Sequence, residues 1–256
     1  MHTAPLHHAF PPEFRGFSER VRGPQPDAVP VTALLQPGAV GGLVARYGAA
    51  LSSGDRRAVL SMWSQHYFLS FIPAVVAGIL VAAQPWDVVL DRSAVMLSDV
   101  GEPVAVCVPE LPRPGEPAGP LDRLTSLLRT HLEPLAAALQ EAGLAAPVVW
   151  SNAGAVLAWT LQTVVVPQAA VAPLSGRLQQ PTWDDGRANP LAAAVQSGLR
   201  DGSRAVCCLR HRLPGTARCA SCPVSCRASG PPSGSSSDPS SGLASCRASC
   251  RATADR

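Results

Sequence analysis

Four cysteines crowd the stretch CCLRHRLPGTARCASC near the end of the chain. Cys207 and Cys208 are adjacent, and Cys219 and Cys222 follow with two residues between them. Cysteine sulfur is a ligand for zinc and for iron–sulfur clusters, and cysteines also pair in disulfides. The segment therefore predicts a structural zinc site, an iron–sulfur cluster or two disulfides.

The beginning of the chain argues against the disulfides. The first twenty residues, MHTAPLHHAFPPEFRGFSER, lack the basic stretch followed by an apolar core that marks a secretory signal. We therefore expect a cytoplasmic protein, and disulfides are rare in that compartment. Clustered cysteines are then more readily metal ligands or redox groups.

The spacing of the four cysteines only weakly distinguishes a zinc site from an iron–sulfur cluster. A zinc site takes paired ligands at the spacing of Cys219 and Cys222. Cys207 and Cys208 do not fit as well, because adjacent side chains of an extended backbone point to opposite sides. A two-iron cluster is a larger body with two separated iron corners, and it tolerates this arrangement better. The spacing favours a cluster and leaves zinc open.

Composition excludes several other functions. The 256 residues are 46% hydrophobic and carry a net charge of +3, so we expect a buried core and no nucleic-acid partner. The sequence contains no Ser/His/Asp arrangement, phosphate-binding loop or HExxH pair that would indicate hydrolytic or nucleotide chemistry. It also contains no lysine, so a local group of arginines says little by itself about anion binding.

The cysteines must be positioned by the rest of the chain, whose sequence patterns predict an α+β fold. We expect it to be mainly helical, with a small antiparallel β-meander. We expect an irregular N-terminal arm (1–40), a helical α+β domain (41–200), a cluster-binding segment (201–226) and a disordered tail (227–256). Apolar spacing predicts helices over 41–65, broken at Ser53-Gly54 with Asp55 as the N-cap of the second, and over 121–143. Further helices are expected over 67–83, from Ser151-Asn152 as a cap onward, and over 189–200. Pro167 and Pro173 are expected to end the helical region that starts at Ser151-Asn152. Short β-branched runs predict strands over 88–90, 94–97 and 104–108.

The run from Tyr67 to Ala83, YFLSFIPAVVAGILVAA, raises the question of a membrane. It lies at the short end of the roughly 17–25 residues that span a bilayer, and it contains Pro73. We favour a buried helix. The alternatives are insertion through this run, with the cysteines on the cytoplasmic side, or peripheral association at the inner face of the membrane.

A family resemblance adds weight to the cluster. The stretch CCLRHRLPGTARCASCP resembles the C-terminal signature of the FhuF-type ferric-siderophore reductases, in which two adjacent cysteines, ten residues, a third cysteine, two residues and a fourth hold one [2Fe–2S] cluster. The stretches MWSQHYFLSFIPAVVAGIL and VVWSNAGAVLAW are similar to two helices of that family. Ser151 stands where the family usually has glycine, and His211 where an aromatic residue is more common.

The resemblance implies that Cys207, Cys208, Cys219 and Cys222 hold a [2Fe–2S] cluster. It further implies a ferric-siderophore reductase that delivers one electron to Fe(III) complexes in the cytoplasm and releases Fe(II). Reduced ferredoxin-like or flavin donors would supply the electron. The alternative is a non-enzymatic siderophore-related or scaffold protein with a structural four-cysteine zinc site. Cys226, Cys246 and Cys250 are expected to be bystanders.

Basic residues surround the cysteines and form a candidate rim for the substrate or the electron donor. They are Arg204, Arg210, His211, Arg212 and Arg218. Such a rim would raise the reduction potential of a cluster and attract an anionic complex or an acidic donor. A solvated arginine-rich surface is an equally good interpretation.

Overall fold

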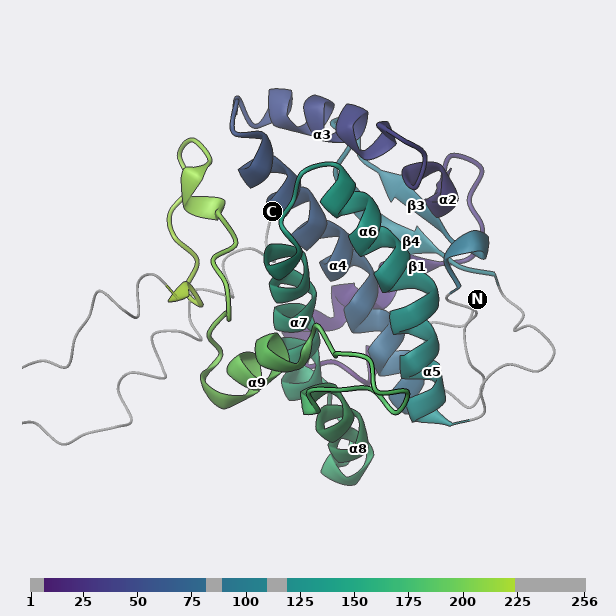
Figure 1. The fold of residues 1–256 in the computed structure, drawn as a ribbon. Helices are drawn as coiled ribbons and strands as arrows, with labels where there is room; N and C mark the ends of the chain where they lie inside the picture. Colours follow the sequence, from purple (N-terminus) through teal and green to yellow (C-terminus); the bar gives the residue numbers. More distant parts are fainter. Residues whose placement is uncertain (1–6, 82–88, 110–118, 224–256) are drawn as a thin grey trace, which may run out of the picture.

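The computed structural model describes residues 7–81, 89–109 and 119–223 of the chain, and it confirms an α+β fold dominated by helices (Figure 1). The helices are α2 (Val31–Leu34), α3 (Ala39–Ala50), α4 (Arg56–Val81), α5 (Pro120–Leu127), α6 (Glu133–Glu141), α7 (Ala146–Thr163), α8 (Gln168–Gln179) and α9 (Ala192–Asp201). Shorter turns are η1 (Pro12–Glu19), η2 (Leu90–Arg92), η3 (Leu128–Leu132) and η4 (Arg210–Arg212). The predicted tail, with Cys226, Cys246 and Cys250, lies outside the described residues.

Helix α4 runs through the middle of the molecule and contacts α3, α7 and β4 (Figure 1). It begins where the sequence predicts, since the Asp55 carboxylate caps it by accepting a hydrogen bond from the Ala58 amide at 3.1 Å. It then continues to Val81 as a single helix with Pro73 inside it, where two helices were expected. A helix that is apolar almost all round needs burial on every side, which the neighbouring elements provide.

The length and composition of α4 would also suffice to cross a membrane. In the described structure, 78% of its most apolar window is buried inside the protein. The burial agrees with the interpretation of a core helix.

A mixed four-stranded sheet packs beside α4, with strand order β1-β4-β3-β2. The strands are β1 (Val21–Arg22), β2 (Val29–Pro30), β3 (Ala94–Leu97) and β4 (Pro103–Cys107). The antiparallel pair β3–β4 confirms two predicted strands. The predicted strand over 88–90 is wrong for its described residues, because Leu90 opens the turn η2, and β2 takes the position beside β3 instead; Val88 lies outside the described residues.

The N-terminal arm is a second correction. Residues 7–40 are not irregular: they supply β1, which pairs in parallel with β4, and β2, which pairs with β3. Phe10 is 2% exposed, and Phe14 and Phe17 pack on Trp159 of α7. The arm therefore closes one side of the core.

The predicted leucine-rich helix over 121–143 forms as α5, η3 and α6 in succession. The π-helical turn η3 directly precedes Pro134, the second residue of α6. Proline has no amide hydrogen to give to the carbonyl four residues earlier, so the helix widens there. The widened turn presents His131 to the core, where its Nε2 lies 2.7 Å from the Tyr67 hydroxyl.

Helices α7 and α9 pack so closely that glycine is required between them. A Cβ on Gly154 would stand 2.5 Å from the Cβ of Ala194, and a Cβ on Gly198 would stand 2.5 Å from that of Ala158. The predicted start of α7 at Ser151-Asn152 is wrong, because α7 begins at Ala146 and buries both residues. The close contact directs the end of α9 toward the cysteines.

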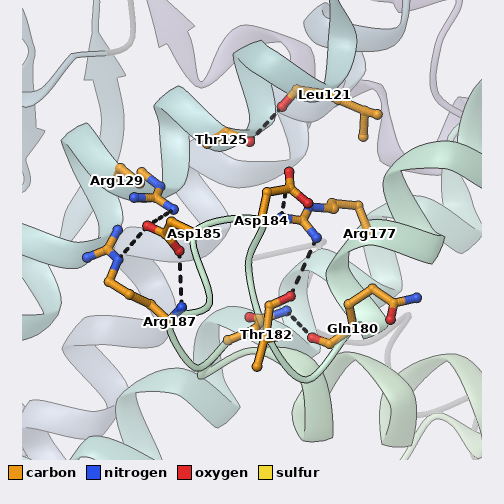
Figure 2. Close-up of polar contacts among 10 residues, drawn as sticks. Leu121, Thr125, Arg129, Arg177, Gln180, Thr182, Asp184, Asp185 and Arg187 are labelled. Atoms are coloured by element: carbon orange, nitrogen blue, oxygen red, sulfur yellow. Dashed lines mark hydrogen bonds and ion pairs between the residues drawn. The ribbon is translucent and has the colours of Figure 1, made fainter.

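The loop from α8 to α9 buries Trp183 and Leu191 in the core, and ion pairs hold its exposed part. Figure 2 shows Asp185 between Arg129 and Arg187, and Arg177 reaching Asp184. The pKa of Asp185 is lowered to about 2, chiefly by the hydrogen bond from Arg129. Helix α8 continues through Pro173, which was predicted to end the preceding helical region.

Candidate metal centre

The cysteine segment follows α9 and lies along the side of the helical body, next to α4 and α7 (Figure 1). Its four thiols fall into two pairs. The Cys208 and Cys219 sulfur atoms are 3.6 Å apart, and the Cys207 thiol shares a hydrogen bond with Cys222. Adjacent Cys207 and Cys208 therefore face different partners, as the geometry of an extended backbone predicts.

Local backbone geometry sets up this arrangement. Leu209 has a φ of +61°, in the left-handed region that non-glycine residues seldom occupy. This turn brings the Leu209 amide to within 3.4 Å of the Cys207 sulfur, to which it donates a hydrogen bond. Gly215, with a φ of +67°, then reverses the chain toward Cys219. The left-handed backbone of Leu209 thus directs its N–H group toward the Cys207 sulfur.

A buried polar network fastens the segment to the helices. The Ser61 hydroxyl of α4 donates to the Cys208 carbonyl at 2.8 Å. The Asn152 amide of α7 donates to the hydroxyl oxygens of Ser61 and Ser64, each at 3.0 Å. All three side chains are fully buried, so these bonds hold polar groups that would otherwise be costly to bury.

Arg204 connects this network to the cysteines. Its two terminal nitrogens donate to Asn152 Oδ1 at 2.9 Å and to Gln65 Oε1 at 3.0 Å. Its amide donates to the Ser221 carbonyl at 2.9 Å, which ties the two arms of the segment together. Arg204 is therefore an anchor of the cysteine segment as well as a nearby positive charge.

The thiols of Cys208 and Cys219 share a hydrogen bond. This bond lowers the pKa of Cys208 to about 5, with the charge of Arg204 acting in the same direction. The same bond, together with burial, raises the pKa of Cys219. Burial raises the pKa of Cys207 as well. The segment thus favours a thiolate at Cys208, the form in which cysteine binds metal.

The other members of the predicted basic rim occupy different environments. His211 Nδ1 lies 3.7 Å from the Cys207 sulfur, at the exposed side of the segment. Arg212 forms an ion pair with Asp55 at 2.7 Å. Arg210 is half-buried, and Arg218 is exposed. The structure does not bring the five side chains together around the four cysteines as one surface.

One observation tests whether these residues fit a two-iron cluster. The Nε–H group of Arg204, whose charge acts on Cys208, is buried and has no hydrogen-bond acceptor among the described residues, and cluster sulfur atoms accept such bonds. Within the described residues, no three Cys, His, Asp or Glu side chains form a group able to hold a single metal ion. The donor set, four cysteine sulfurs in one short segment, is of the kind that holds a [2Fe–2S] cluster, and in that chemical sense it fits.

Sequence reasoning missed the residues that fasten the segment. Ser61, Ser64 and Gln65 stand on one face of an otherwise apolar helix, a signal that could have marked a buried polar contact. Asn152 was interpreted as a helix cap, because an Asn before an apolar run has the same local pattern. Only the three-dimensional contact with Arg204 shows its role.

Comparisons with known families agree with this site. The model of the family described as ferric iron reductase FhuF-like transporter matches residues 61–203, more than half of the chain. The model described as FhuF 2Fe-2S C-terminal domain matches residues 204–223, which include all four cysteines of the segment. Among curated proteins, no relative matches the chain.

Proposed function

This chain belongs to the FhuF-like family of ferric iron reductases, and its residues 204–223 match the 2Fe-2S domain of that family. We therefore propose that it reduces Fe(III) in siderophore complexes. The family match supports an oxidoreductase connected with iron, and the matched 2Fe-2S domain supports a [2Fe–2S] cofactor. The choice of a siderophore as the iron carrier is the proposal.

We assign the cluster to Cys207, Cys208, Cys219 and Cys222. The observation that carries the assignment is the pairing of these thiols beside Arg204, whose buried Nε–H group has no acceptor among the described residues. When bound, a [2Fe–2S] cluster supplies a centre that accepts and donates a single electron.

A single electron suffices for this reaction. Siderophores hold Fe(III) with hard oxygen donors, and Fe(II), with its lower charge, is held far less tightly by the same oxygens. One electron passes to the chelated Fe(III), Fe(II) leaves the chelate, and a reduced ferredoxin-like or flavin donor replaces the electron. No bond in the chelator is cleaved, which agrees with the lack of acid–base or nucleophilic motifs in the sequence.

The chain's own residues have positioning roles in this scheme. Ser61, Asn152 and Arg204 fix the cysteine segment against α4 and α7. The amide of Leu209 and the charge of Arg204 stabilise negative charge on the cysteine sulfurs, which raises the potential at which an electron is accepted.

We also propose that the protein acts in the cytoplasm, where the five described thiols, including buried Cys107, stay reduced. Peripheral association with the inner face of the membrane is the alternative. Sedimenting the membranes separates the two locations, because a cytoplasmic protein stays in the supernatant and a peripheral one sediments with the membranes. A carbonate wash then releases a peripheral protein and leaves an inserted one in the membrane.

Anaerobic purification tests the cofactor and its ligands together. We expect visible absorption that dithionite bleaches, a rhombic electron paramagnetic resonance signal in the reduced state, and iron and sulfide in equal amounts. Cys208→Ala should lose the cluster and the reduction of ferric siderophores together. Cys107→Ala is the matched control, because it removes a buried thiol from β4 and should keep both.

A colourless protein that holds zinc would overturn this proposal. It would make the cysteine segment a structural clamp and favour the non-enzymatic alternative. A Cys208→Ala variant that still reduces ferric siderophores would contradict the assignment of the cluster to these cysteines.

A further inference from the structure

Tyr67 and His131 form a buried polar pair that the proposed function does not use. Both side chains are fully buried, and the Tyr67 hydroxyl oxygen lies 2.7 Å from His131 Nε2. Among the described residues the hydroxyl has no other hydrogen-bond partner, and a buried O–H group without an acceptor would be costly. The phenol hydrogen therefore points at Nε2, and the imidazole accepts it.

Aromatic rings enclose the pair. Phe71 stacks on the His131 ring with centroids 4.2 Å apart, and Phe68 meets the Tyr67 ring edge-on at 6.3 Å. His131 reaches this place from the π-helical turn η3, and such turns are frequent at functional sites. Apolar side chains in place of Tyr67 and His131 would leave no polar group to satisfy, so stability alone does not account for the pair.

The geometry suits the loss of one electron together with one proton. Burial raises the pKa of Tyr67, so the hydroxyl keeps its proton in the resting protein. A phenol that loses an electron becomes a strong acid, and its proton must move to a base at once. His131 Nε2 is that base, because it already accepts the hydrogen bond. Tyr67 is therefore able to become a neutral radical without help from solvent.

Trp63 extends the pair toward the surface. Its ring stacks on that of Tyr67, with centroids 5.7 Å apart and an angle of 25° between the planes. Its indole N–H donates to the Gly101 carbonyl at 2.9 Å, in the turn between β3 and β4. The next residue, Glu102, is partly exposed and paired with His66. Rings in contact allow an electron to pass in short steps, so Trp63 connects Tyr67 with this turn.

The pair also lies close to the cysteine segment. Ser61 and Gln65, which hold the segment, stand on the same helix as the tyrosine. Along the axis of α4, Tyr67 is about 9 Å from Ser61. Reduction of iron at the segment would thus take place about two helical turns from the tyrosine. Fe(II) formed there reacts with hydrogen peroxide to give strong one-electron oxidants.

We propose that Tyr67 is a redox-active residue that takes up oxidising equivalents formed when Fe(II) meets hydrogen peroxide beside the protein. Fe(II) and peroxide give Fe(III), hydroxide and a hydroxyl radical, and this radical takes one electron from Trp63 and becomes hydroxide. Tyr67 returns an electron to Trp63 and passes its proton to His131 Nε2. One electron from the ferredoxin-like or flavin donor and the proton from His131 then restore the tyrosine. The inference rests on the proposed function for the source of Fe(II) and goes beyond it by adding a protective reaction.

Flash oxidation with tris(bipyridine)ruthenium(III) tests the tyrosine without iron turnover. In holo-protein with its cluster oxidised, we expect the absorption and the electron paramagnetic resonance signal of a neutral tyrosyl radical. The chain has two tyrosines, so Tyr67→Phe should lose the signal and Tyr47→Phe should keep it. Tyr47 is the matched control, because it is buried but its hydroxyl makes no hydrogen bond with any described residue. A missing signal in wild type, or one that survives in Tyr67→Phe, would overturn the inference.

His131→Gln separates proton transfer from structure. The glutamine amide oxygen accepts a hydrogen bond but does not hold a proton, so the variant should keep the visible spectrum of the cluster and lose the radical. An undiminished radical would contradict the role of His131. Wild-type protein exchanged into heavy water gives the same test if the variant does not fold. Radical formation should slow there, and an unchanged rate would count against the inference.

Turnover in the presence of peroxide separates the two proposals. With a ferric siderophore, a reductant and hydrogen peroxide, Tyr67→Phe should lose its visible absorption after fewer turnovers than wild type or Tyr47→Phe. Equal losses in the three proteins would overturn the protective reaction while the proposed function stands. If wild-type protein reduces no ferric chelate, the proposed function fails, and the flash experiment still decides whether Tyr67 is redox-active.

Discussion

Replacing Asn152 with alanine should loosen the cysteine segment far more than it loosens the rest of the fold. Asn152 is fully buried and accepts a hydrogen bond from Arg204 while donating to the hydroxyls of Ser61 and Ser64. It is therefore the link between α7, α4 and the segment. Its removal leaves a buried guanidinium nitrogen without its acceptor.

The magnitude follows from these contacts. A hydrogen bond to a charged group contributes about 1.5–3 kcal/mol, and a neutral one about 1 kcal/mol. The Asn152→Ala change should therefore cost about 3 kcal/mol. The bonds from Asn152 to Ser61 and Ser64 join α7 to α4, so only the bond from Arg204 counts toward opening of the segment. Because about 1.4 kcal/mol corresponds to a factor of ten, loss of that bond makes opening on the order of 10- to 100-fold more frequent. If iron leaves the cluster only when the segment is open, an added chelator should remove iron faster by a similar factor.

The assay is the loss of visible absorption when anaerobic holo-protein is mixed with an excess of an iron chelator. Asn189→Ala is the matched control, because Asn189 is a buried asparagine whose amide donates to the Leu178 and Gln180 carbonyls, away from the cysteines. It should lower the thermal midpoint comparably and release iron at close to the wild-type rate. Equal release rates in the two variants would refute the argument that Asn152 fastens the segment.

Three other perturbations test separate parts of the structure. Arg204→Gln should lower the reduction potential by on the order of tens of millivolts, because a positive charge beside Cys208 is lost; a redox titration with no shift would contradict this. Gly154→Ala should cost about 1–3 kcal/mol and lower the thermal midpoint, since the new Cβ would meet Ala194, whereas Gly176→Ala, with open space around it, should not. The hydrogen bond from Arg129 lowers the pKa of Asp185 to about 2. The ionised Asp185 carboxylate therefore contributes stability at pH values above the ordinary pKa of aspartate, and this contribution is lost as the pH falls toward 2. Asp185→Asn should therefore lose less stability than wild type between about pH 5 and pH 2, as followed by circular dichroism.

The sequence predicted best those parts of the fold in which local signals and tertiary packing agree. The break at Ser53-Gly54 and the cap at Asp55 were predicted because capping chemistry is local. The adjacent pair β3–β4 was predicted because its strands are short apolar, β-branched runs separated by a turn at Gly101-Glu102-Pro103. The ordered structure of the N-terminal arm was not predicted. A two-residue strand such as β1 is too short to show a periodic pattern, and its partner β4 lies about eighty residues later in the chain.

The candidate site divides in the same way. The cysteines are visible in the sequence because ligand spacing is itself a local signal, and the matched 2Fe-2S domain confirms the resemblance. Asn152 and Arg204 are 52 residues apart, so no local pattern connects them. Tyr67 and His131 are likewise 64 residues apart, and no single stretch of sequence predicts their contact.

The manner of attachment explains how one chain can combine a rigid core with a cysteine segment on its flank. The core of α4, α7 and the sheet is apolar and complete without the segment, which contributes few residues to it, chiefly Leu213 and the buried thiols of Cys208 and Cys222. The segment is held instead by directional bonds from Ser61 and Arg204. Hydrogen bonds of this kind fix position more strictly than apolar contact does, and they place N–H groups and a positive charge beside the sulfurs. The same residues that hold the segment in place are therefore the ones expected to set the potential of its cluster.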